Sequence, residues 1–203
     1  MTDPADFPAL EPVGETSFLR HWAQLDAVVR LAPRVDQGGS LLCWSAGCAT
    51  GEEPYSLAMV LREAGRAGDR IIATDTAEER LALARAARYG DWTLRRVDAA
   101  RRLRWFRRHG EEWELLPALR DAVEFRRHDL AAEPPPWTFD VVLCRNVLIY
   151  FNPGQARRAA AALLEAVRPG GLLVLGPVEL PAAEGLPVEW VEQDGATVLR
   201  RTG

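Results

Sequence analysis

Three groups of polar residues in this sequence each follow an apolar stretch that is typical of a buried strand. They are the glycine-rich segment 44–56 (WSAGCATGEEPYS), the acid Asp75 and the pair Arg145-Asn146. Ligands of open α/β sheets bind at the carboxyl ends of the strands, where a glycine-rich turn lets a ligand approach bare backbone at a helix N-terminus. The spacing therefore favours a ligand site that contains Gly47, Asp75 and the Arg145-Asn146 pair.

Asp75 has two interpretations. An acid directly after the second strand of a nucleoside-binding α/β fold can accept hydrogen bonds from two ribose hydroxyls. An aspartate in front of a helix can also be a simple N-cap, here of a helix that begins near Thr76. Because the acid occurs together with the glycine-rich turn, the combination favours a nucleoside cofactor.

The charges near the turn help to choose among nucleoside cofactors. A nicotinamide site requires the pattern G-x-G-x-x-G with an acid about 20 residues further on, and neither the glycines here nor the spacing from Gly47 to Asp75 fits it. Glu52 and Glu53 at the turn suit a cationic ligand better than a pyrophosphate. S-adenosylmethionine carries a sulfonium and an ammonium group, so the sequence favours a methyl donor over a nicotinamide cofactor.

Along the rest of the chain, apolar runs typical of strands alternate with patterns typical of helices. This alternation predicts an α/β fold with a sheet covered on both faces. Gly170-Gly171 is expected to end the last helix, and Asp194-Gly195 to form the turn of a C-terminal antiparallel hairpin. The predicted strands are 41–45, 70–74, 139–144, 172–175, 188–191 and 196–200, and the predicted helices are 18–34, 52–66, 77–88 and 153–168.

A segment of about residues 91–122 interrupts this alternation and is predicted to be a small inserted α+β subdomain. Residues 95–108 contain seven arginines and one acid, Asp98. These arginines either form a solvated helix face or dock an acidic partner. Residues 113–115 and 123–125 have the pattern of short strands, and we assign both to the insertion.

The composition excludes several classes of protein. The chain has 203 residues, a formal net charge of −4 and no lysine, so Schiff-base chemistry and a P-loop lysine are excluded. The three cysteines and three histidines are too scattered for a metal site or a disulfide framework, and we expect no metal. The net charge disfavours a nucleic-acid partner. With no apolar stretch of about 18 residues and no signal peptide, a cytoplasmic protein without membrane insertion is expected.

At this point the chain resembles a known family. The runs SAGCATGEEPYSLAM, ATD and CRNVLIYF are similar to those of the CheR-type chemotaxis receptor methyltransferases, which make protein-glutamate methyl esters from S-adenosylmethionine. The segments Thr16–Arg20 and 128–130 (HDL) extend the resemblance, which covers about residues 13–201. It implies a class I methyltransferase (Rossmann-like) doubly wound sheet with a small inserted subdomain, and S-adenosylhomocysteine as product.

The resemblance also implies roles for particular residues. Arg20 and Tyr150 match the residues nearest the transferred methyl, and we predict that they are catalytic. With Gly47 of the turn, the predicted cofactor-binding residues are Thr16, Arg20, Gly47, Glu53, Asp75, Asp129, Leu130, Arg145 and Asn146.

The sequence differs from the family pattern in three places. Gly14 stands where the family prefers Asn, Leu19 replaces a Phe, and segment 176–179 (GPVE) replaces G-H-S-E. The chain also begins too late for the family's separate N-terminal helical domain, which a separate partner chain could supply. We divide the chain into a tail with a lead-in helix (1–36) and a methyltransferase domain (37–203).

These observations predict an S-adenosylmethionine-dependent O-methyltransferase that acts on a carboxylate. The expected acceptor is a glutamate of an acidic, receptor-like protein. One alternative is an enzyme of the same fold that acts on a carboxylate-bearing small molecule or another non-receptor acceptor. The other is a non-catalytic module that binds the methyl donor or its product.

Overall fold

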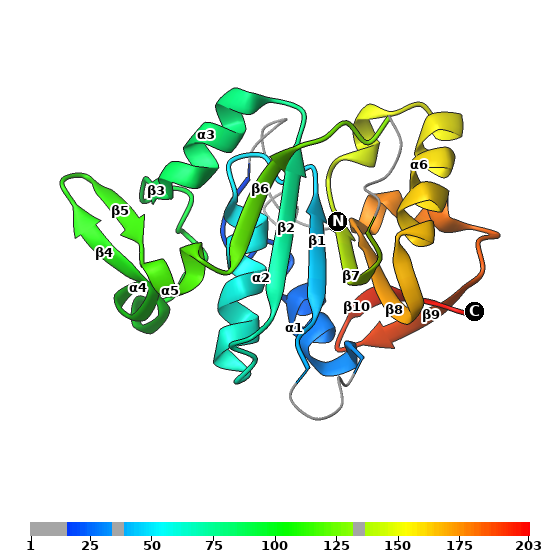
Figure 1. Cartoon of the computed structure of the whole chain (residues 1–203), viewed down its shortest axis with the longest axis horizontal. Helices are drawn as coiled ribbons and strands as arrows, with labels where there is room; N and C mark the ends of the chain where they lie inside the picture. The colour runs from blue at the N-terminus through cyan, green and yellow to red at the C-terminus, as the bar shows by residue number, and fades with distance from the viewer. Residues whose placement is uncertain (1–15, 34–38, 132–136) are drawn as a thin grey trace, which may run out of the picture.

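The computed structural model describes residues 16–33, 39–131 and 137–203, and its centre is a seven-stranded sheet with helices on both faces (Figure 1). The first five strands across the sheet are parallel, and the last two are antiparallel to their neighbours. In order across the sheet, the strands are β6 (Val123–Arg127), β2 (Arg70–Asp75), β1 (Leu42–Ala46), β7 (Phe139–Cys144), β8 (Val167–Leu175), β10 (Ala196–Arg201) and β9 (Val188–Gln193). The predicted fold class is therefore confirmed.

The alternation of side chains along the buried strands creates two apolar cores. In β7, Val141 and Leu143 pack into the core under the first two helices, whereas Val142 and Cys144 pack into the core under the last helix. Such continuous apolar strands are typical of parallel sheets covered on both faces. The helices that cover the sheet are α1 (Trp22–Leu31), α2 (Glu52–Glu63) and α3 (Glu78–Ala86) on one face and α6 (Pro153–Glu165) on the other.

Several helix boundaries differ from the prediction: the predicted helix 52–66 ends at Glu63, and the predicted helix 77–88 spans Glu78–Ala86. Two further differences have local reasons. The predicted helix 18–34 begins only at Trp22, because Leu19 (φ 56°) and His21 (φ 51°) have left-handed backbone. The predicted helix 153–168 ends at Glu165, and Gly170-Gly171 lies inside β8 instead of closing the helix. The glycine pair accompanies an irregularity in the β7–β8 register, a position where strands use glycine.

The predicted insertion forms a small second sheet beside α3, at the left of Figure 1. Phe18 connects it to the main core, because its ring makes edge contacts with Tyr89 at 4.8 Å and Phe106 at 5.2 Å. The insertion begins earlier than predicted, because its first strand is β3 (Arg88–Tyr89), where we expected the helix 77–88 to end. Its other elements are α4 (Ala99–Trp105), β4 (Phe106–His109), β5 (Glu112–Leu115) and α5 (Pro117–Arg120). The division of the chain at residue 36 stays a prediction.

Our assignment of residues 123–125 to the insertion was wrong. They form β6, which pairs in parallel with β2 and is an edge strand of the main sheet. Val123 and Phe125 pack against the core while Glu124 is exposed. This alternation is typical of an edge strand in either sheet, so the sequence pattern could not distinguish the two.

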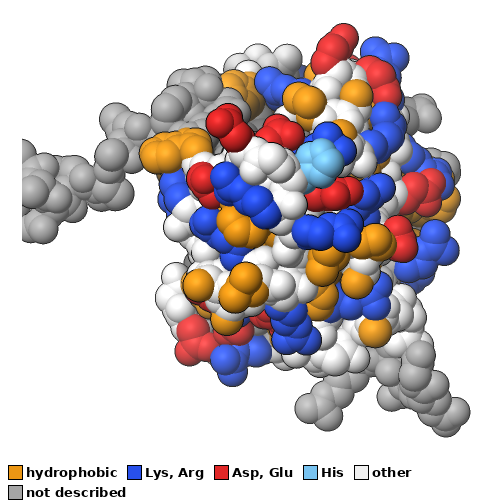
Figure 2. Space-filling model, turned by 90° about the vertical axis from the view of Figure 1, so that its left-hand side faces the viewer, with side chains coloured by type: hydrophobic (Ala, Val, Ile, Leu, Met, Phe, Trp, Pro, Cys, Tyr) orange, Lys and Arg blue, Asp and Glu red, His pale blue; other side chains and the backbone are white. Residues whose placement is uncertain are grey.

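Most of the arginines between residues 95 and 108 have partners within the chain. Figure 2 shows this face, where arginine side chains lie among acidic and apolar ones. Arg101 contacts Glu63 at 3.0 Å, and its guanidinium lies 4.5 Å from the centre of the Trp22 ring. Arg102 pairs with Asp91 at 3.1 Å. The contacts of Arg101 attach α4 to α1 and α2, a role that neither of our two interpretations of the arginines included.

Candidate active site

The carboxyl ends of β1, β2 and β7 surround a cavity of about 340 Å³. This size is within the range of small-molecule sites, roughly 300–1,000 Å³. The structure places all ten predicted site residues on its wall, although their roles stay predictions. They are Thr16, Arg20, Gly47, Glu53, Asp75, Asp129, Leu130, Arg145, Asn146 and Tyr150.

The turn after β1 presents bare backbone to this cavity. Gly47 has φ 77°, and the N–H groups of Gly47 and Cys48 both donate to the Thr74 carbonyl, at 2.8 and 2.9 Å. A Cβ added at Gly47 would lie 2.5 Å from Cγ2 of Val147. Glycine is therefore required here both for its backbone conformation and for the close approach of the loop after β7.

Gly47→Ala is expected to lower the free energy of unfolding by about 1–2 kcal/mol from left-handed strain and about 1–3 kcal/mol more from overlap with Val147. Gly65→Ala is the matched control, because Gly65 has a similar φ of 79° with no atom within 4 Å of an added Cβ. Gly65→Ala should lower the free energy of unfolding only by the contribution of left-handed strain, about 1–2 kcal/mol. Equal losses in urea unfolding experiments would contradict the overlap.

Asp75 is buried at the end of β2 and faces the cavity. Its Oδ2 accepts a hydrogen bond from the Ala49 N–H at 2.9 Å, and its Oδ1 accepts one from the Ala77 N–H at 3.0 Å. The N-cap residue of α3 is Ala77, so Asp75 is not the helix cap that we considered as the alternative. An ionised carboxylate offers about four acceptor sites, so Asp75 retains acceptor capacity for ligand hydroxyls.

The two glutamates after the turn have different environments. Glu53 lines the cavity; its Oε1 accepts from the Ser45 hydroxyl at 2.7 Å, and its Oε2 pairs with Nε of Arg145 at 2.8 Å. Glu52 is buried outside the cavity and accepts from the Thr50 hydroxyl. Our electrostatic argument from both acids was therefore wrong for Glu52, and Arg145 offsets part of the charge of Glu53.

Burial raises the pKa of the Glu52 carboxyl above its usual value. The pKa of a glutamate in the unfolded chain is about 4.3, and the pKa of Glu52 in the folded protein is higher. The two values bound a pH window in which only the unfolded state has lost the proton. Since the unfolded state loses this proton first, stability decreases as pH rises through that window. Glu52→Gln is expected to remove this decrease, measured as the difference between variant and wild type in urea unfolding from pH 4 to 8. Parallel profiles would contradict it.

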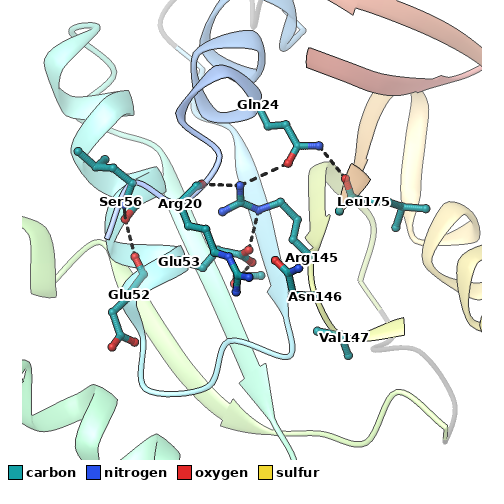
Figure 3. Close-up of polar contacts among 12 residues, drawn as sticks. Arg20, Gln24, Glu52, Glu53, Ser56, Arg145, Asn146, Val147 and Leu175 are labelled. Carbon is teal, nitrogen blue, oxygen red and sulfur yellow. Dashed lines mark hydrogen bonds and ion pairs between the residues drawn. The ribbon is translucent and has the colours of Figure 1, made fainter. Parts of the chain in front are cut away.

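Arg145 connects three parts of the chain beneath the cavity (Figure 3). Its side chain is 2% exposed; besides the Glu53 pair, its Nη1 donates to the Arg20 carbonyl at 2.8 Å and to Oε1 of Gln24 at 3.4 Å. Gln24 in turn donates to the Leu175 carbonyl. Arg145 therefore fixes the segment that carries Arg20, which lies between the left-handed residues Leu19 and His21.

The outer part of the site comes from the loop after β7. Asn146 has a left-handed φ of 62°, and Tyr150, in the short helix η3 (Leu148–Tyr150), is 57% exposed at the rim of the cavity. Asp129 and Leu130, after β6, also line the cavity. Burial lowers the pKa of the neighbouring His128, which also lines the cavity and is neutral near pH 7.

Our sequence analysis missed two residues that organise the site, Gln24 and Glu179. Gln24 lies in α1, where a polar residue at a buried position was the available signal. Glu179 follows β8 in the helix η4 (Pro177–Ala183) and accepts backbone hydrogen bonds from the Asn146 loop. The sequence feature that could have revealed Glu179 was an acid shortly after the end of a buried strand. Our comparison of segment 176–179 with the family pattern considered only the His and Ser that this chain lacks.

The donor set fits a nucleoside sulfonium ligand. Asp75 provides acceptors for hydroxyls, the Gly47 turn provides bare backbone, and the half-buried Leu130 provides an apolar wall. Within residues 16–33, 39–131 and 137–203, no group of three or more His, Cys, Asp or Glu side chains is placed to hold a metal ion. Every helix in these same ranges is too short or too polar to span a bilayer.

The comparisons with known proteins agree with this geometry. The family model "CheR methyltransferase, SAM binding domain" matches residues 14–187. The chain is 36% identical over 188 residues to a chemotaxis protein methyltransferase of Listeria monocytogenes, covering 89% of this chain and 72% of that protein. It is 37% identical over 164 residues to chemotaxis protein methyltransferase 1 of Pseudomonas aeruginosa, covering 76% of this chain and 59% of that protein.

A solved structure shares the fold. The N-methyltransferase NodS of Bradyrhizobium japonicum, in complex with S-adenosylhomocysteine, superposes with a TM-score of 0.54 at 15% identity and covers 95% of this chain and 92% of that chain. The fold, the cavity and the matching family model define an S-adenosylmethionine-dependent methyltransferase. More particularly, the chain belongs to the CheR methyltransferase family.

Proposed function

We propose that this enzyme methylates a carboxylate oxygen, and that the acceptor is a glutamate side chain of a receptor-like protein. The observation that carries the proposal is the position of Tyr150, which is 57% exposed at the rim of a cavity with a buried floor. An acceptor at this rim can be presented by another macromolecule. The relatives of this chain in Listeria monocytogenes and Pseudomonas aeruginosa are chemotaxis protein methyltransferases, which supports a protein acceptor.

We assign the inner part of the cavity to the methyl donor. S-adenosylmethionine, when bound, supplies an electrophilic methyl group on a positively charged sulfur. Asp75 would accept hydrogen bonds from the ribose hydroxyls, and the Gly47 turn would contact the ligand through its backbone. Glu53 places negative charge near the cationic end, and Arg145 holds Glu53 in position. The remaining cofactor contacts are assigned to Thr16, Arg20, Asp129, Leu130 and Asn146.

We assign the acceptor end to Arg20 and Tyr150. A glutamate carboxylate is ionised at neutral pH, with an unperturbed pKa of about 4.3, so it needs no general base before it attacks. The Arg20 guanidinium would orient the carboxylate, and the Tyr150 hydroxyl would donate a hydrogen bond to one of its oxygens. Exclusion of water raises the reactivity of the anion towards a cationic donor, provided that Arg20 engages only one oxygen.

The test is to incubate the protein with methyl-labelled S-adenosylmethionine and a bacterial lysate, and to identify the labelled species. A labelled protein whose label is released in mild base as methanol supports a glutamyl ester. A base-labile label on small molecules only would favour the small-acceptor alternative. A base-stable label would contradict carboxylate methylation. Tight binding of S-adenosylmethionine with no transfer would favour a non-catalytic module. A separate partner chain with a helical domain stays a prediction.

Tyr150→Phe is expected to lower turnover about tenfold or more, because it removes the hydroxyl that aligns the acceptor. The affinity for S-adenosylhomocysteine, measured by calorimetry, should change less than about twofold, since the inner cavity stays intact. Ile149→Val is a matched control, because Ile149 is also exposed and also lines the cavity but has no hydroxyl, and it should change turnover less than about twofold. If the Tyr150 variant lost affinity and turnover to the same extent, Tyr150 would have a structural role instead.

A further inference from the structure

The loop from Asn146 to Tyr150 must be held in a conformation that is unfavourable by itself. It leaves a fully buried strand and turns through the left-handed Asn146 (φ 62°) before entering the short helix η3. Non-glycine residues adopt this backbone only when the surroundings impose it. The first N–H groups of any helix also lack partners within the helix. Four consecutive N–H groups, from Asn146 to Ile149, therefore need acceptors.

A single buried carboxylate supplies these acceptors. Oε1 of Glu179 accepts from the N–H groups of Val147 and Leu148, each at 2.7 Å, and from that of Ile149 at 3.4 Å. Oε2 accepts from the N–H groups of Asn146 at 2.8 Å and Gly176 at 2.7 Å. The Glu179 residue is 4% exposed. Both oxygens are thus used to fix backbone, and the charge is stabilised by the N–H dipoles that converge on it.

The neighbouring sequence leaves room for this carboxylate. Gly176 directly follows β8, and a Cβ added there would overlap the Glu179 carboxylate. The backbone φ of Gly176 is −61°, a value that any residue adopts, so the reason for glycine at this position is space for Glu179. The two residues therefore act as a unit.

We propose that Glu179 is a positioning residue of the active site. It does not line the cavity, and it acts through the backbone of the loop that carries Asn146 to the inner cavity and Tyr150 to the rim. Both carboxylate oxygens are required as acceptors, because a glutamine would offer one oxygen and point an N–H₂ group at N–H donors. The link to Tyr150 rests on the proposed function, whereas the link to Asn146 concerns only the cofactor.

The test compares Glu179→Gln with wild type in two measurements that need no methyl-acceptor substrate. The affinity for S-adenosylhomocysteine, measured by calorimetry, is expected to fall at least tenfold. Hydrogen exchange of the amides in residues 146–149 is expected to accelerate at least tenfold, while exchange of β1 amides stays within about twofold. Glu165→Gln, an exposed carboxylate at the end of α6, is the matched control and should change neither quantity.

Two outcomes would overturn the proposal. One is a folded Glu179→Gln protein with unchanged affinity and unchanged loop exchange. The other is equally accelerated exchange in the loop and in β1, which would mean general destabilisation without positioning. If Glu179→Gln does not fold, Gly176→Ala displaces the same carboxylate and must give the same local signature; wild-type behaviour of that variant would also overturn the proposal.

Methyl transfer tests the Tyr150 part separately. If Glu179 positions Tyr150, then Tyr150→Phe should lower the rate about tenfold in wild type and less than about twofold in the Glu179→Gln background. Equal effects in both backgrounds would reject this part. Absence of any methyl ester would reject the proposed function, but the affinity and exchange results would still decide the role of Glu179 at the cofactor site.

Discussion

Asp75→Ala is expected to weaken binding of S-adenosylhomocysteine by about 1–3 kcal/mol, which is roughly a five- to 150-fold rise in Kd. The substitution removes the carboxylate that we assign to the ribose hydroxyls. It also removes the acceptor for the N–H groups of Ala49 and Ala77, so the turn after β1 loses a fixed point. Calorimetric titration of the purified variant measures the change.

β2 provides a matched control for this prediction, because a second buried carboxylate lies at its other end. Asp69 immediately precedes the strand and accepts from the Leu41 N–H at 2.8 Å, as Asp75 does from Ala49 at the far end. Asp69→Ala should lower stability and leave the affinity within about twofold of wild type. Unchanged affinity in Asp75→Ala, or an equal loss in both variants, would remove Asp75 from the ribose role.

The sequence alone predicted the elements that bring the site together. Continuous apolar runs mark the buried strands, and the polar residues that follow them, such as Asp75 and the Arg145-Asn146 pair, lie where parallel strands end together. The sequence also identifies Gly47 as part of a glycine-rich turn, and in the structure this glycine has a positive φ. These features are local, because each depends on residues that are neighbours in the sequence.

Contacts between distant residues could not be predicted in the same way. Arg145 pairs with Glu53 from another element, and Glu179 accepts hydrogen bonds from four N–H groups of the loop after β7, which lie 30 to 33 residues earlier in the chain. The hydrophobic periodicity of the sequence contains no information about such pairs. For the same reason β6 was assigned to the wrong sheet, since its alternation of Val123, Glu124 and Phe125 contains no information about which strand it joins.

Arg145→Met is expected to lower the free energy of unfolding by about 3–5 kcal/mol, the cost of leaving a buried charge without its partner. Glu53 is the charge concerned; its side chain is 13% exposed and 2.8 Å from the Arg145 guanidinium. The substitution also removes the hydrogen bonds to the Arg20 carbonyl and to Gln24, so the segment that carries Arg20 loses one of its attachments to the sheet. Urea unfolding monitored by circular dichroism measures the loss.

Two further variants separate the buried pair from a general effect of losing an arginine. Arg200 pairs with Glu189 at 2.9 Å on the surface, and Arg200→Met should cost less than about 1 kcal/mol. The double variant Glu53→Gln with Arg145→Met should recover part of the loss, because it removes the unpaired carboxylate. If the double variant were less stable than Arg145→Met by the full cost of Glu53→Gln alone, the two residues would be energetically independent and Arg145 would stabilise the site through its contacts with Arg20 and Gln24 instead.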